Sequence, residues 1–173
     1  DAYNTAVGYA AGVNVSTGIR NTLMGGLAGD AITTGSYNVA IGQSTLSEED
    51  TGSRNVAIGS RALEVLNFNG NGYNIAIGYD AGVSVTTGVQ NTIIGGLAGD
   101  ALRTGERNVA IGQSAMGSAN GSESRNVAIG WSALASMDSD STNYNIAVGY
   151  NAGAAITSGV QNTIIGSLAG DAM

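Results

Sequence analysis

The sequence predicts an all-β fold, a parallel β-solenoid (β-roll) of about ten rungs with 17–19 residues each. Three observations support this prediction. An asparagine recurs ten times at nearly regular spacing, a short and mostly apolar run follows it each time, and a glycine ends that run in every unit. The recurring asparagines are Asn4, Asn21, Asn38, Asn55, Asn74, Asn91, Asn108, Asn126, Asn145 and Asn162.

Each unit is expected to begin with a strand. Runs such as Val39–Ala40–Ile41 are too short for a stable helix, which needs about 12–15 residues. Side chains alternate along a strand, so Val39 and Ile41 share one face and Ala40 occupies the other. The glycine that follows, Gly42 in this unit, supplies the positive φ that a sharp corner requires.

The second half of each unit is expected to form the opposite wall. An alanine stands seven residues after the asparagine in nine of ten units, and a Thr-Gly or Ser-Gly turn usually closes the unit. Eleven residues after the asparagine the residue is apolar in nine of ten units, and Glu49 is the exception. These apolar residues are Val15, Ile32, Leu66, Val85, Leu102, Ala119, Met137, Ile156 and Met173.

A single unit cannot bury its apolar face, but stacked units pair as in any sheet at about 4.8 Å and give a rod of about 45–50 Å. The asparagines then align along the rod. They are candidates for a structural ladder of amides bonded from rung to rung. The alternative is that each asparagine only shapes its own turn.

A longer period groups the rungs in fours. We interpret residues 1–173 as a single solenoid segment of a longer fibre, with four-rung modules at 4–73 and 74–144 and a partial module at 145–173. The two longest spacings, from Asn55 to Asn74 and from Asn126 to Asn145, close equivalent rungs. Their extra residues, within 66–72 and 137–143, are therefore expected to protrude as loops on the same side.

Composition narrows the function. The chain has 28 glycines, no cysteine and no histidine, and charged residues are 11% against roughly 25% in typical domains. A net charge of −7 argues against a nucleic-acid partner, and no apolar stretch approaches the ~18 residues of a membrane span, so we expect no membrane insertion. Without cysteine there is neither a disulfide framework nor a thiolate zinc site.

The run Asn-Val-Ala-Ile-Gly at Asn38–Gly42, continued at Asn55–Ala62, Asn108–Ala115 and Asn126–Ala133, resembles the head repeat of YadA-type trimeric autotransporter adhesins. The longer pattern, with a Thr-Gly turn before each asparagine, is similar to repeat arrays of phage tail-fibre proteins. The resemblance implies a left-handed parallel β-roll assembled as a homotrimer. It also implies that the protein functions as a cell-surface adhesin or a receptor-binding fibre. The rungs of this chain are longer than those of the adhesin heads.

The residues themselves also favour association. A rung of this length offers four or five apolar side chains, several of them alanine, against an ordering cost of about 1–2 kcal/mol per residue. Packing copies of the chain side by side would bury the second apolar face, and closed rotational symmetry is the usual arrangement. The expected partner is therefore the chain itself, as a homotrimer or filament.

No catalytic, cofactor-binding or metal site is expected, and the chain is predicted not to be an enzyme. Asp30, Asp100 and Asp171 share one repeat position but stand about four rungs apart, ~19 Å at sheet spacing. We interpret them as solvated turn residues, with a ring of carboxylates around a threefold axis as the alternative. Glu48–Asp50 is expected to be a solvated loop rather than a loose calcium site.

Four aromatic residues are the candidates for surface contact: Tyr9, Tyr79, Trp131 and Tyr150. They stand at one repeat position, two residues before the recurring alanine, and aromatic rings on a rod surface could stack on the sugars of a receptor. Packing at a corner or chain interface is the interpretation we favour.

These features predict a structural and adhesive fibre segment, from a phage tail fibre or a bacterial surface adhesin, that spans distance and contacts a cell-surface glycan or protein receptor. The expected location is extracellular, on a virion tail or a cell surface. The alternative is a subunit of a self-assembling extracellular filament with no receptor-binding role.

Overall fold

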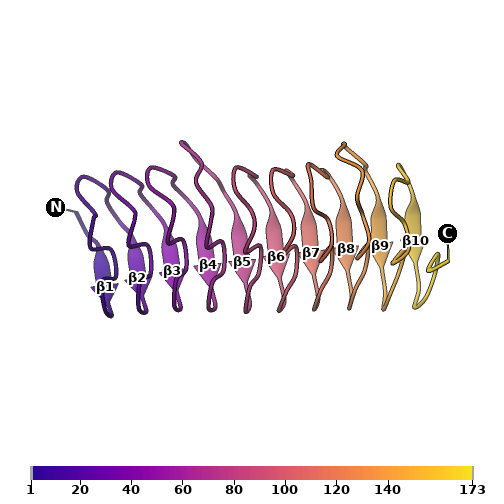
Figure 1. Cartoon of the computed structure of the whole chain (residues 1–173), viewed down its shortest axis with the longest axis horizontal. Helices are drawn as coiled ribbons and strands as arrows, with labels where there is room; N and C mark the ends of the chain where they lie inside the picture. Colours follow the sequence, from indigo (N-terminus) through magenta and orange to yellow (C-terminus); the bar gives the residue numbers. More distant parts are fainter. Residues whose placement is uncertain (1, 173) are drawn as a thin grey trace.

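One parallel sheet of ten strands runs the length of the molecule in the computed structural model, which describes residues 2–172 (Figure 1). The prediction of an all-β parallel solenoid is confirmed. Met173, which the repeat assigns to the opposite wall, lies outside the described residues. The strands are β1 (Thr5–Val7), β2 (Thr22–Met24), β3 (Val39–Ile41), β4 (Val56–Ile58), β5 (Ile75–Ile77), β6 (Thr92–Ile94), β7 (Val109–Ile111), β8 (Val127–Ile129), β9 (Ile146–Val148) and β10 (Thr163–Ile165).

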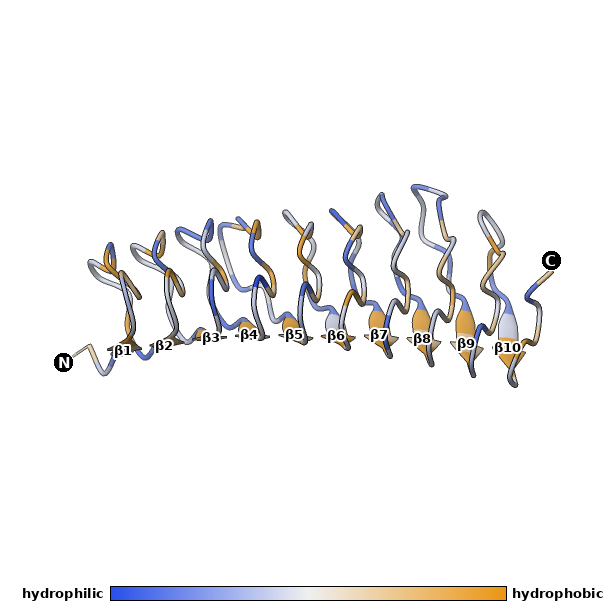
Figure 2. Cartoon of the chain, turned by 60° about the horizontal axis from the view of Figure 1, so that its bottom comes forward, coloured by the Kyte–Doolittle hydropathy of each residue, from blue (hydrophilic) through white to orange (hydrophobic). Residues whose placement is uncertain are grey.

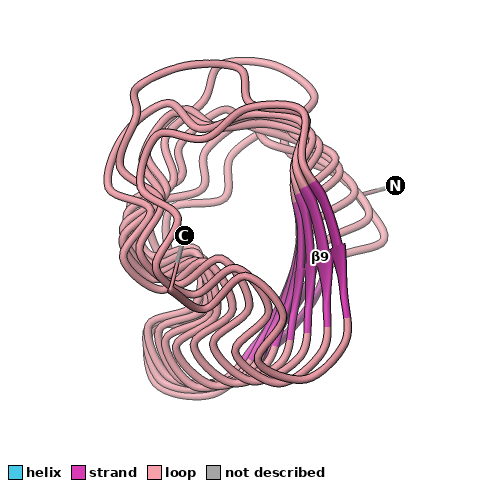
Figure 3. Cartoon of the chain, turned by 90° about the vertical axis from the view of Figure 1, so that its right-hand side faces the viewer, coloured by secondary structure: helices cyan, strands magenta, loops and turns pink. Residues whose placement is uncertain are grey.

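Strands pair in sequence order, and equivalent repeat positions are paired throughout. Val39 is paired with Val56 and Ala40 with Ala57, for example, because each stands at the same place in successive units. Seen along the rod, the strands lie behind one another on one side and the turns close each coil on the other (Figure 3). Every repeat position therefore becomes a column of side chains that runs parallel to the rod axis.

The core is filled by alternate residues, as a strand requires. The central residue of each strand points inward, and from β2 to β10 it is at most 8% exposed. The alanine seven residues after the asparagine and the residue eleven after it complete the interior over most of the rod. Glu49 takes the latter position in its rung and is also buried, so the position points inward even where its residue is charged.

The four-rung period reflects where each rung places its large core side chain. In the rung of β4, Leu63 stands eight residues after the asparagine and the strand contributes small Ala57. In the rung of β6 the large residue is Ile93, in the strand, and the position eight residues after the asparagine is Gly99. Between these rungs a Cβ on Gly82 would lie 3.0 Å from the Ile93 Cδ1 and 3.1 Å from the Leu63 Cδ2. Large and small residues thus alternate to keep the density of a protein interior.

The corner after each strand depends on glycine. Gly78 has a φ of 141°, and a Cβ there would lie 2.5 Å from the carbonyl oxygen of Gly95 in the next rung. Neither the backbone conformation nor the spacing between rungs admits a side chain. The same close approach recurs at the glycine that ends each run from β1 to β9.

The extra residues of the two long rungs protrude on the same side, after β4 and β8 (Figure 1). Isolated parallel bridges, Ser53 to Asn71 and Ser124 to Thr142, attach each loop to the preceding rung. Among the described residues there is no helix of the length and apolar character needed to cross a membrane.

Candidate binding surface

The outer face of the sheet is a mostly aliphatic surface. It consists of the residues one and three positions after each asparagine, which are valine, isoleucine, methionine or threonine in all ten strands. No charged side chain stands at either position. Ile75 and Ile77 of β5 are 38% and 36% exposed, and the strands lie along one border of the molecule in Figure 2. We call this surface the outer sheet face.

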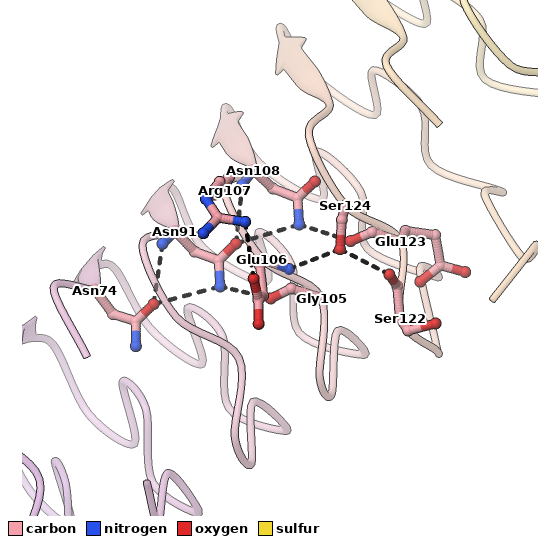
Figure 4. A network of polar contacts seen from close by, with 9 residues as sticks. All are labelled: Asn74, Asn91, Gly105, Glu106, Arg107, Asn108, Ser122, Glu123 and Ser124. Atoms are coloured by element: carbon pink, nitrogen blue, oxygen red, sulfur yellow. Dashed lines mark hydrogen bonds and ion pairs between the residues drawn. The ribbon is translucent and has the colours of Figure 1, made fainter. Parts of the chain in front are cut away.

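The asparagine column lies just inside one border of the outer sheet face. Each side-chain oxygen accepts a hydrogen bond from the backbone N–H of the asparagine in the next rung, and the nine N···O distances are 2.8–3.2 Å. The side-chain nitrogen usually donates to a glycine carbonyl in the turn that closes the rung, as from Asn91 to Gly105 at 2.8 Å (Figure 4). One amide therefore closes its own rung and joins it to the next.

The rungs with long loops use other acceptors. The side-chain nitrogen of Asn55 has only a 3.4 Å contact to the carbonyl of Ser53, and that of Asn126 donates to the side chain of Asn143 at 3.2 Å. The loop residues thus take the place of the glycine carbonyl that accepts this hydrogen bond in six of the other rungs. The bond to the next asparagine N–H is retained in both places.

Over the first five rungs tyrosine and arginine alternate immediately before the asparagines, in a column that was not predicted. The guanidinium of Arg20 packs over the rings of Tyr3 and Tyr37, and that of Arg54 packs over Tyr37 and Tyr73, with 4.9–5.9 Å to the ring centres. Cations within about 6 Å of a ring centre are attracted to its face. The sequence contains a pattern that indicates this column, because the residue before the asparagine is Tyr or Arg in eight of ten rungs.

The four aromatic candidates all lie at the surface, at the opposite border of the outer sheet face. Tyr9 is 83% exposed, and its ring neither stacks on another ring nor packs under a guanidinium of the described residues. Trp131 and Tyr150, in adjacent rungs, stack on each other with ring centres 5.1 Å apart and planes 11° apart. A stacked pair covers one face of each ring, so a sugar would have to approach the remaining faces or the edges.

Tyr79 belongs to a third arrangement. Its hydroxyl accepts a hydrogen bond of 3.2 Å from Arg61, whose guanidinium also binds the carboxylate of Asp80 through two hydrogen bonds. Asp80 is 5% exposed, and the bidentate pair keeps that carboxylate from being buried without a partner. The hydrogen bonds to Asp80 raise the pKa of Arg61 above its ordinary value. This aromatic residue is therefore held by an ion pair between neighbouring rungs.

Two buried glutamates hold the protruding loops, and here the expectation of a solvated loop at Glu48–Asp50 is wrong for Glu49. Its carboxylate accepts hydrogen bonds from the backbone N–H of Gly52 at 2.7 Å and of Phe68 at 3.4 Å. Glu123 similarly accepts from Gly121 and Ser139, each at 3.0 Å. Burial raises the pKa of Glu49 to about 7, against the lowering effect of its backbone hydrogen bonds.

The recurring aspartates are only partly solvated. Asp171 is exposed, whereas Asp30 and Asp100 each have one shielded carboxylate oxygen without a hydrogen-bond partner. Burial raises the pKa of Asp100. Within residues 2–172, no three carboxylates, histidines or cysteines are grouped closely enough to hold a metal ion.

No family model, no curated protein and no solved structure matches this chain.

Proposed function

We propose that this chain is a segment of a non-catalytic structural and adhesive fibre, in which copies pack side by side through the outer sheet face as a homotrimer. The observation that carries the proposal is the outer sheet face itself. It is continuous over ten strands, uncharged, and lined by exposed aliphatic side chains. Contiguous exposed apolar surfaces of this size mark sites of protein association.

The dimensions fit a stable interface. Ten strands at about 4.8 Å span roughly 45 Å, and the outer sheet face together with its Arg/Tyr and Tyr/Trp border columns spans about 20 Å at ~3.3 Å per residue. The product, about 900 Å², compares with roughly 800 Å² per partner in standard protein interfaces. Three copies with these faces turned toward a common axis would leave the turns and the two protruding loops at the outside.

The likeness of Asn38–Gly42 and its repeats to YadA-type head repeats and phage tail-fibre arrays supports the rest of the proposal. On that basis the coil is left-handed and the fibre is extracellular, on a bacterial surface or a virion tail. The shaft spans distance and the outward loops and turns contact a receptor.

The mass in solution tests the proposal. Sedimentation equilibrium should give three times the chain mass of 17.1 kDa. Ile77→Glu places a charge at the centre of the outer sheet face and should yield monomers that keep the circular dichroism of the wild type. Thr87→Glu, at an exposed turn of the same rung, is the control and should leave the trimer intact.

A monomeric wild-type chain would sink the proposal, as would an Ile77→Glu variant that still assembles. Long end-to-end filaments in electron micrographs would favour the filament subunit instead. Intact fibres that bind nothing on a glycan array or on target cells would remove the adhesive part and leave the structural one.

A further inference from the structure

A polar groove of about 320 Å³ lies at the corner before the asparagines, beside the second protruding loop. Four charged side chains line it: Glu106, Arg107, Arg125 and Asp140. The other five lining residues are serines and threonines, and no aliphatic or aromatic side chain contributes. Figure 4 shows the part of its wall formed by Glu106, Arg107, Ser122 and Ser124. The groove begins at the Arg/Tyr border of the outer sheet face and extends onto the second protruding loop, so it opens at the rim of the assembly proposed above.

The groove departs from the repeat. In the first module, the positions of Glu106, Arg107 and Asp140 are occupied by Ser36, Tyr37 and Asn69. Arg125 alone has a counterpart of the same type, Arg54. The core positions of the two modules are nearly the same. The three charged residues that the second module has in place of uncharged ones are therefore a difference confined to the surface.

Two of the charged groups in the groove, Arg125 and Asp140, form no ion pair or hydrogen bond through their side chains with any described residue, whereas the other two pair with each other. Arg107 forms an ion pair with Glu106 at 3.0 Å. The guanidinium of Arg125 only packs over the ring of Tyr144, at 5.6 Å, and forms no hydrogen bond or ion pair with any described residue. Asp140 folds back over Gly121, where a side chain would occupy the same space, and its carboxylate likewise accepts no hydrogen bond from a described residue.

The wall around these groups is fixed. Ser124 donates its hydroxyl to the carbonyl of Ser122 at 2.8 Å and accepts the backbone N–H of Glu106 at 3.0 Å. Behind it, Glu123 is fully buried and holds the loop through Ser139. A donor and an acceptor thus face solvent from a preformed polar wall, which reduces the entropy lost on binding.

We propose that this groove binds an acidic saccharide, with the sugar carboxylate on Arg125 and sugar hydroxyls on Asp140 and the neighbouring Ser/Thr hydroxyls. Guanidinium binds carboxylate through paired hydrogen bonds. A phosphate dianion would set charged oxygens against the Asp140 carboxylate, whereas sugar hydroxyls can donate hydrogen bonds to it. A peptide would lack an apolar pocket for its side chains. The inference rests on the adhesive role proposed above and names its ligand class.

Isothermal titration with tri-galacturonate tests the inference on the assembled protein. The wild type should bind the acid and not its methyl ester. Arg125→Gln should weaken binding at least about tenfold, the loss of one charge-assisted contact. Arg54→Gln is the matched control, because it stands at the same repeat position beside Tyr37 and Asn71 rather than in the groove. It should bind like the wild type.

Equal binding of acid and ester, unchanged binding by Arg125→Gln, or absence of binding to the wild type would each overturn the proposal. Sedimentation of the same samples separates the two proposals. A monomer that binds the acid contradicts only the fibre, and a trimer that ignores it contradicts only the groove.

Discussion

At the scale of the residue, the buried asparagine amide accounts for the recurrence that defines the repeat. Its oxygen and nitrogen satisfy two backbone groups that would otherwise be buried without partners, the N–H of the next asparagine and the carbonyl of its own turn. An unpaired buried backbone group costs about 1–3 kcal/mol. No other uncharged side chain of this length offers both an acceptor and a donor.

Replacement of Asn91 by alanine should therefore destabilise the fold strongly. The change leaves the Asn108 N–H and the Gly105 carbonyl unpaired, so we expect a loss of about 2–5 kcal/mol in the free energy of unfolding. Urea denaturation followed by circular dichroism measures it. Asn14→Ala is the control, because Asn14 is exposed and water replaces its bond to Asp30. Equal losses for the two variants would contradict the role assigned to the column.

Glu49 should make stability depend on pH. Its pKa is raised from 4.5 to about 7 in the folded state, so the folded chain binds the proton more tightly than the unfolded chain. The resulting stabilisation is complete below pH 4.5 and is lost as the pH rises to about 7, by up to about 3 kcal/mol. Glu49→Gln should flatten this part of the curve of unfolding free energy against pH. Exposed Glu48→Gln should retain the slope, and a slope that survives in Glu49→Gln would refute the assignment.

At the scale of the element, each rung is a three-residue strand and a glycine corner, followed by turns whose inward side chains complete the core. Three residues have almost no strand stability alone, so the rung exists because its neighbours pair with both its edges. The spacing between rungs at the corner then limits what the chain accepts there, and Gly78 and Gly96 show the two extremes.

Gly78→Ala should destabilise the fold by more than about 2 kcal/mol. Its φ of 141° is a conformation that costs a side chain about 1–3 kcal/mol, and the added Cβ would press on the Gly95 carbonyl. Gly96→Ala should change the free energy of unfolding very little, because its Cβ would meet only the backbone carbonyl oxygen of Tyr79, at 3.9 Å. Thermal unfolding compares the two variants. Similar melting temperatures would show that the corner is not as tight as described.

Much of the element could be predicted from the sequence because the repeat shows each position ten times. The strand at Val39–Ile41, the inward Ala40 and the corner at Gly42 all follow from the period of the repeat and the alternation of a strand. Glu49 could not be predicted, because a charge at an apolar position suggests exposure until its backbone partners Gly52 and Phe68 are known.

The surface was less predictable than the core. The stacking of Trp131 on Tyr150 and of Arg54 between two tyrosines depends on side-chain directions that no spacing specifies. The groove at Arg125 depends on a loop that folds back from the next rung, so its lining residues come from three separate stretches of chain.

At the scale of the whole molecule, the regular column structure separates two kinds of surface. The outer sheet face is uniform along the rod, as expected of a surface that packs against identical copies. The turns and loops differ from module to module, as expected of a surface that contacts other molecules. The groove at Arg125 lies on this second, variable side, at the border of the first.

The arrangement of the chains around the fibre axis tests the central claim most directly. Electron cryomicroscopy of the assembled protein, viewed along the rod, should resolve three coils whose ten-stranded sheets face a common axis, with the loops at 66–72 and 137–143 at the periphery. Single rods, or assemblies in which the sheets face solvent, would contradict the account.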